Sequence, residues 1–290
     1  MRRALDAVRN GSRLLASLKR PGIGYAVVGS LAFLAFLVVN FPYDLALSRL
    51  LAPLGLELSY KGQAPSFPLG ISLSNVSVTS AFGGLDDPVF SGTQLEVTPV
   101  LESLAVGQPG LAMSGQAYGG FLSVTVAGAK GAIRVNFNAT GLSLGRYPAL
   151  RRFGVVAAGL LSGRGDGLLD LAKFSGNSAR LALEAHNLTV RFAQGLAPVR
   201  LGTVAGNLDL KGRTIELRQL SGHGADLTLD MHGTVALAPD PRESTVNLIL
   251  KLDPTAAGRS RLGFLLNLLP HQPGVRPYRI RGRIYAPSVT

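Results

Sequence analysis

The chain has no cysteine and no tryptophan among its 290 residues. Without cysteine there are no disulfide bonds, no thiolate nucleophile and no cysteine-ligated metal. Charge is scarce as well, because Asp, Glu, Lys and Arg make up only 16% of the residues, against about a quarter in an average protein. The fold must therefore depend on apolar packing and backbone hydrogen bonds.

Motifs that carry enzymatic chemistry are missing too. The sequence has no G-x-S-x-G, no Walker A motif and no G-x-G-x-x-G that opens a helix. Asp166 and Asp170 stand four residues apart, as do Asp226 and Asp230. The apolar residues between them favour the solvent face of a strand over a calcium site or a catalytic carboxylate pair. We expect no enzymatic activity, no metal and no cofactor.

Positive charge is in excess, with a net charge of +12. Part of it lies before residue 21, and the clearest other cluster is Arg276, Arg279, Arg281 and Arg283. No nucleic-acid-binding module is recognisable, so nucleic acid is not an expected partner. Anionic lipid headgroups or an acidic protein are better candidates, with Arg279, Arg281 and Arg283 as headgroup contacts. The plain alternative is that these arginines line the solvent face of a last strand.

An uncharged apolar stretch covers residues 22–41, long enough for a helix to cross a bilayer. We predict a membrane anchor here, with the basic residues 1–21 in the cytoplasm by the positive-inside rule and residues 42–290 exported. A cleaved signal peptide is the alternative, but this stretch is longer than its usual apolar region and no good cleavage site follows. A buried core helix is the third option. The residues predicted to form the membrane anchor are Ile23, Val27, Leu31, Leu34, Phe36 and Val39.

After Gly55 the hydrophobic period becomes two, which is typical of β-strands. Alternating segments separated by Gly-rich turns continue almost to the C-terminus. The sequence therefore predicts a mainly β protein: one membrane helix, then a long curved antiparallel sheet with two or three short helices. The expected helices are 44–54, 146–161 and 254–269, and 278–286 is expected to be a closing strand.

Two phase slips in the alternation fall beside Asn75 and Asn187, where a β-bulge is predicted. The segments around them resemble each other, and each is followed by a Gly-containing turn. These echoes suggest that the periplasmic domain, 42–290, consists of two similar β-units, at about 56–145 and 163–290. Chance similarity between β-meanders would explain the echoes equally well.

The alternation places apolar residues on one face of the predicted sheet. The face is either an ordinary core covered by a helix or an open groove that holds acyl chains, because both need the same pattern. The predicted groove residues are Ile71, Leu73, Val124, Val126, Leu181, Leu183, Leu227 and Leu229.

Several short motifs, taken in order, resemble one family. They are F-P-Y-D at 41–44, S-F-P-L-G at 66–70, L-S-N-V at 73–76, Y-G-G at 118–120 and G-R-I-Y-A-P at 282–287. With the basic tail and the apolar stretch, they resemble the type II secretion system protein N family in its non-enteric form. More distantly, strands that open with glycine resemble AsmA-like periplasmic β-proteins, which are associated with lipid handling.

The first resemblance implies a non-enzymatic, single-pass component of the bacterial inner membrane with a periplasmic domain. Its partners would be other inner-membrane and periplasmic components of the secretion system. The second implies a protein that binds or transfers phospholipid. Neither resemblance brings catalytic residues.

Overall fold

The structure is a computed structural model of the chain. It describes residues 29, 43, 47, 56–66, 70–80, 88, 90–100, 103, 108, 110–129, 131–147, 150, 154–170, 173–192, 197–238, 243–284 and 286–290. The predicted membrane anchor lies outside these residues, apart from Gly29. Among the residues described, no helix is both long enough and apolar enough to cross a membrane.

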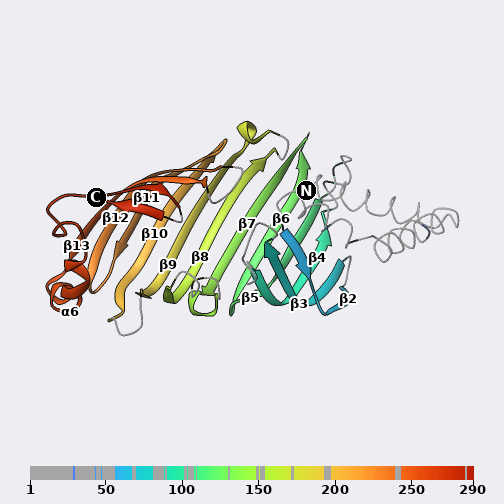
Figure 1. Ribbon diagram of the computed structural model, residues 1–290. Coiled ribbons are helices and arrows are strands. Elements are labelled where there is room, and N and C mark those ends of the chain that lie inside the picture. Colours follow the sequence, from blue (N-terminus) through green and yellow to red (C-terminus); the bar gives the residue numbers. More distant parts are fainter. Residues whose placement is uncertain are drawn as a thin grey trace, which may run out of the picture.

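The described chain is mainly β, as predicted, and its strands form one antiparallel sheet of fifteen. Neighbours in the sheet are neighbours in the chain from β3 to β15, whereas β1 and β2 both pair with β3. Figure 1 shows the strands side by side along an elongated molecule. The strands are β1 (Leu56–Ser59), β2 (Gly62–Ser66), β3 (Gly70–Ser80), β4 (Phe90–Pro99), β5 (Gly110–Ala117), β6 (Gly120–Ala129), β7 (Ala132–Ser143), β8 (Val156–Leu169), β9 (Ser178–Arg191), β10 (Val199–Lys211), β11 (Thr214–His223), β12 (Leu227–Ala236), β13 (Thr245–Pro254), β14 (Tyr278–Arg283) and β15 (Ala286–Val289).

A predicted turn and one of the two predicted bulges are present. Tyr118 and Gly119, with φ of 51° and 81°, form the two-residue loop between β5 and β6, since positive φ at both positions suits the twist of a hairpin. Asn75 and Asn187 also have positive φ, of 51° and 53°. The register shifts beside Asn187 opposite both β8 and β10, so the bulge predicted there is confirmed. The register between β3 and β4 is the same on both sides of Asn75, so the structure shows no extra residue there and that predicted bulge is wrong.

Two predicted elements are wrong. The segment 146–161 was expected to be a helix, but β8 begins at Val156 and pairs with both β7 and β9. Gly159 has φ of 142°, a value outside the helical range. The hydrogen-bonded pairing of β8 with strands on both sides outweighs the helix propensity of its Ala and Leu residues. The closing strand 278–286 is instead a hairpin, in which β14 turns back into β15.

The predicted helix at 254–269 is confirmed as α6 (Ala256–Asn267). Thr255 caps it, because its hydroxyl accepts a hydrogen bond from the Gly258 amide at 3.0 Å. Two short 3-10 turns, η2 (Leu144–Arg146) and η3 (Phe174–Gly176), flank β8. α6 lies at one end of the elongated sheet in Figure 1.

Candidate functional site

One face of the sheet is apolar over nearly its whole length, and we call it the apolar face. Paired residues on adjacent antiparallel strands point to the same side, so the register connects them into rows across the sheet. The row through Leu73 is Leu73, Leu95, Gly115, Leu122, Ala139, Gly163, Leu183, Gly206, Leu220, Met231, Leu250 and Tyr278. It runs from β3 to β14 without a charged side chain.

Two further rows on this face have the same character. One is Ile71, Val97, Met113, Val124, Phe137, Gly165, Leu181, Leu208, Leu217, Gly233, Leu248, Ile280 and Val289. The other is Pro99, Leu111, Val126, Val135, Gly167, Ala179, Leu210, Ile215, Val235, Val246, Gly282 and Pro287. The register thus places six of the eight predicted groove residues in these three rows. The other two, Leu227 and Leu229, lie on the same strand and face as Met231.

The opposite face, the polar face, carries hydroxyl, amide and charged side chains. Its central row is Thr98, Ala112, Thr125, Asn136, Asp166, Arg180, Asp209, Glu216, Thr234, Asn247, Arg281 and Ser288. On this face Asp209 is buried and pairs with Arg218. The two faces therefore have opposite chemistry, and only one suits an apolar ligand.

Both ends of the apolar face are covered. At the N-terminal end, the helical residues Tyr43 and Leu47 pack with Leu73 and Val97, both of which are fully buried. At the C-terminal end, Leu262 of α6 packs with Val199, Leu227 and Leu229. Ile71, Leu73, Leu227 and Leu229 thus belong to covered cores.

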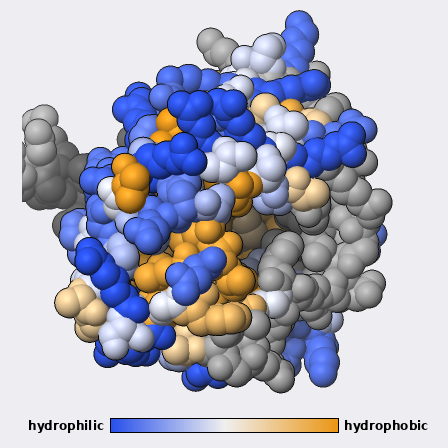
Figure 2. All heavy atoms as spheres, turned by 60° about the vertical axis from the view of Figure 1, so that its left-hand side comes forward, coloured by the Kyte–Doolittle hydropathy of each residue, from blue (hydrophilic) through white to orange (hydrophobic). Residues whose placement is uncertain are grey.

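The middle of the apolar face is different. Val124, Val126, Leu181 and Leu183, on β6 and β9, are all partly exposed. Viewed from the side of α6, Figure 2 shows apolar side chains gathered in a hollow of the molecule. Of the predicted groove residues, these four lie where a ligand could reach them.

In this middle region, the three residues of β8 that point to the apolar face are all glycine: Gly163, Gly165 and Gly167. A side-chain carbon at 163 would lie 2.6 Å from Leu183 of β9 and 3.6 Å from Phe137 of β7. The side chains of the two neighbouring strands therefore close over β8, which contributes backbone rather than side chains to this part of the apolar face. The spacing of these glycines is visible in the sequence, but only the strand pairing shows which face they share.

The three arginines predicted to contact headgroups lie elsewhere. Arg279 and Arg281 flank Ile280 on β14, and Ile280 belongs to the apolar face. By alternation, Arg279, Arg281 and Arg283 are on the polar face, where the Arg281 Nε donates to the Asn247 Oδ1 at 3.1 Å. They do not line the hollow, so any contact with a headgroup would have to be made around the sheet edge.

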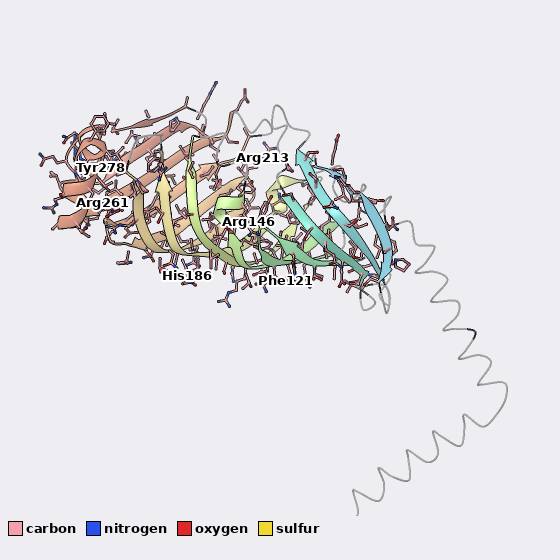
Figure 3. All side chains as sticks on the ribbon, turned by 90° about the horizontal axis from the view of Figure 1, so that it is seen from below. Phe121, Arg146, His186, Arg213, Arg261 and Tyr278 are labelled. Atoms are coloured by element: carbon pink, nitrogen blue, oxygen red, sulfur yellow. The ribbon has the colours of Figure 1, made fainter. Side chains whose placement is uncertain are left out.

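A charged cluster that the sequence did not reveal joins α6 to the sheet. The carboxylate of Asp226, in the turn before β12, is fully buried and accepts from two arginines. The Arg200 Nη2 donates at 2.9 Å and the Arg261 Nη1 at 2.7 Å. The backbone amide of Arg200 adds a third contact at 2.8 Å. Figure 3 labels Arg261 and Tyr278 at this end of the molecule.

Electrostatics keeps Asp226 ionised. Its hydrogen bond to the Arg200 guanidinium lowers the pKa of the carboxyl, and this outweighs burial, which acts in the opposite direction. The same hydrogen bond raises the pKa of Arg200. Since two guanidinium groups share one carboxylate, the cluster keeps one net positive charge.

Within the described part of the chain, no three His, Cys, Asp or Glu side chains are grouped so that they could hold a metal ion. No protein-family model, curated protein or solved structure matches this chain. The chemistry of the two sheet faces therefore carries the functional argument, beside the resemblance noted in the sequence.

Proposed function

We propose that the protein is a non-enzymatic component of the bacterial envelope that holds phospholipid acyl chains against the middle of its apolar face. The observation that carries this proposal is the set of three apolar rows, which are partly exposed between two covered ends. Tyr278 is the one residue of these rows with an ionisable side chain, and it is fully buried with its hydroxyl bonded to the His271 carbonyl oxygen. The face therefore supports binding rather than catalysis.

The dimensions of the face suit an acyl chain. From β6 to β11 a row crosses five strand spacings of about 4.8 Å, or roughly 24 Å of continuous apolar surface. Each methylene buried from water contributes about 0.8 kcal/mol. Large contiguous apolar surfaces on exported proteins normally have an occupant. A lipid tail would cover the face without any polar partner.

The rest of the proposal follows from the N-terminal sequence. We propose that residues 22–41 anchor the protein in the inner membrane and that the sheet is periplasmic, which brings the apolar face close to a source of phospholipid. The second candidate function is that of a type II secretion component, protein N. The order of the short motifs favours it, and a lipid-binding sheet is compatible with it.

The test is site-specific photocrosslinking in cells with the full chain. A photoreactive residue replaces Val124 or Leu181 on the apolar face, and matched controls replace Thr125 or Ala182, their neighbours on the polar face. We expect phospholipid in the crosslinked product at 124 and 181, and only background at 125 and 182. Equal labelling of both faces, or none at 124 and 181, would disprove lipid binding.

The same experiment separates the two candidates. If position 124 captures no lipid while the full chain co-isolates with inner-membrane secretion components, the protein is a scaffold. In that case it would dock through its strand edges, where unpaired backbone groups of β15 are available for pairing.

A further inference from the structure

Three large apolar side chains are presented to solvent at one end of the molecule. Val275, Phe264 and Leu268 are 74%, 68% and 66% exposed, the highest values for large apolar side chains among the described residues. Phe264 on α6 and Leu268, the residue that caps its C-terminus, stand four apart and share a face. Leu262 holds the other side of the helix against the sheet. The apolar exposure is therefore concentrated in one place, which we call the α6 tip: α6 and residues 268–279.

The segment that carries these side chains is basic. From residue 254 to the C-terminus there are six arginines and no acid. Arg259 and Arg261 lie in the first half of α6, and Arg276 follows Val275. Helix N-termini favour acidic residues, yet α6 has none in its first turn. The tip therefore collects uncompensated positive charge beside exposed apolar groups.

The tip is held rigidly. Asp226 binds Arg261 of α6 and Arg200 of β10, so it links the helix to the sheet. One carboxylate neutralises only one of these two guanidinium groups. Beyond α6, the His271 ring stacks on Tyr278 with centroids 4.1 Å apart. The Tyr278 hydroxyl donates to the His271 carbonyl oxygen at 2.7 Å, which closes the turn carrying Val275 and Arg276.

From this arrangement we infer that the α6 tip docks on an anionic phospholipid bilayer. Phe264, Leu268 and Val275 enter the boundary between headgroups and acyl chains, while Arg259 and Arg276 meet lipid phosphates. Exposed apolar side chains together with basic residues in one surface segment are typical of interfacial membrane binding. Because α6 also covers one end of the apolar face, the bilayer would lie at the end of the proposed groove.

The test measures vesicle binding by the full chain held in nanodiscs of neutral phosphatidylcholine, so that the predicted anchor is already occupied. The nanodiscs are floated with vesicles of phosphatidylcholine alone or with 30% phosphatidylglycerol. We expect at least about tenfold more protein to float with the anionic vesicles, and the difference to decrease at high salt.

Two variants test the two chemistries. Phe264→Ser/Leu268→Ser removes apolar contact, and Arg259→Glu/Arg276→Glu reverses charge without touching the Asp226 cluster. Each should reduce flotation about tenfold. The matched controls are Phe121→Ser/Phe192→Ser, also exposed apolar residues, and Arg164→Glu/Arg180→Glu on the polar face; both should bind like the wild type. Melting curves check that every variant is folded.

The inference fails if the wild type binds neutral and anionic vesicles equally, or binds neither. It also fails if tip and control variants lose binding to the same extent, as general adhesion would cause. If the α6 tip binds acidic proteins rather than lipid, the same amount of protein would float with and without phosphatidylglycerol. Failure here is distinguishable from failure of the groove, because crosslinking at Val124 does not require the tip.

Discussion

The two ends of the apolar face and its middle have the same sequence pattern but different surroundings. Leu73 and Val97 at the N-terminal end are fully buried, whereas Val124 and Leu181 in the middle are partly exposed. In both regions, apolar and polar residues alternate along the strands. The comparison teaches that alternation specifies which face is apolar, while a separate segment decides whether that face is a core or an accessible surface.

The covering segments are helical in both cases. Tyr43 and Leu47 cover β3 to β5, and α6 covers β10, β12 and part of β13. Each lies outside the alternating pattern, at one extreme of the chain. The middle strands have no such neighbour among the described residues, so their apolar side chains keep part of their surface.

The largest effect is expected at the covered N-terminal end. Leu73→Asp would bury an unpaired carboxylate in a closed core, and should lower the free energy of unfolding by about 4–5 kcal/mol. Denaturant unfolding of the detergent-solubilised protein measures this change. A loss no greater than that of the same substitution in the middle would contradict the division of the face into covered and open regions.

At the C-terminal end, Asp226→Asn should cost about 3 kcal/mol, because two arginines lose a buried anionic partner. Arg200 lowers the pKa of the folded carboxyl below its usual 3.8, so this stabilisation is present above pH 3.8 and is lost as pH falls through the lowered pKa. Unfolding at several pH values should give a constant difference from the wild type between about pH 5 and 8 and a smaller one below about pH 4. A difference that grows on acidification would mean that Asp226 is not the ionised partner.

In the middle, Val124→Asp should cost only about 1–2 kcal/mol, since the carboxylate can reach water. Thr125→Asp, one position along on the polar face, should stay within about 0.5 kcal/mol. Both are read from melting curves, and only the former should reduce lipid capture by a photoreactive residue at Leu181. Equal costs at 124 and 125 would show that the faces are assigned wrongly.

The smallest effect on stability is expected on the outer side of α6. Phe264→Ser should change the free energy of unfolding by no more than about 0.5 kcal/mol, because the ring is mostly in solvent, whereas Leu262→Ser on the buried side should cost about 3 kcal/mol. The contrast is measured by denaturant unfolding. Similar losses at both positions would mean that Phe264 packs within the fold.

Much of the sheet could be predicted because its determinants are local. Period-two alternation identified most strands, Tyr118-Gly119 identified a hairpin, and Asn187 identified a bulge. The helix predicted over 146–161 fails from Val156 onward, because its Ala and Leu residues suit either state and pairing with β7 and β9 decides. The sequence predicts which residues form the apolar face, but not which of them are accessible. Accessibility depends on whether a helix packs over them, and such a helix is distant in sequence from the strands it covers.

The α6 end was the least predictable part. Asp226, Arg200 and Arg261 come from three separate segments, and nothing in their spacing signals that they meet. Within α6, the helical spacing of Leu262, Leu265 and Leu266 does indicate the buried side, and these three residues belong to the covered core. The arginines near the C-terminus are visible in the sequence, but they point to Arg279, Arg281 and Arg283 on the last strands as headgroup contacts or as a solvent face, and not to α6.

The order of the strands has a consequence for how the protein is made. From β3 onward each strand pairs with the one synthesised just before it, so no strand waits for a distant partner and loop closure costs little conformational entropy. The sheet can grow hairpin by hairpin, in the direction in which the chain leaves the ribosome or a translocation channel. During this growth each new strand adds to the edge formed by the strand before it, and α6 can cover the apolar face only once β10, β12 and β13 have formed. The sheet can therefore assemble in chain order, with this cover added after the strands beneath it.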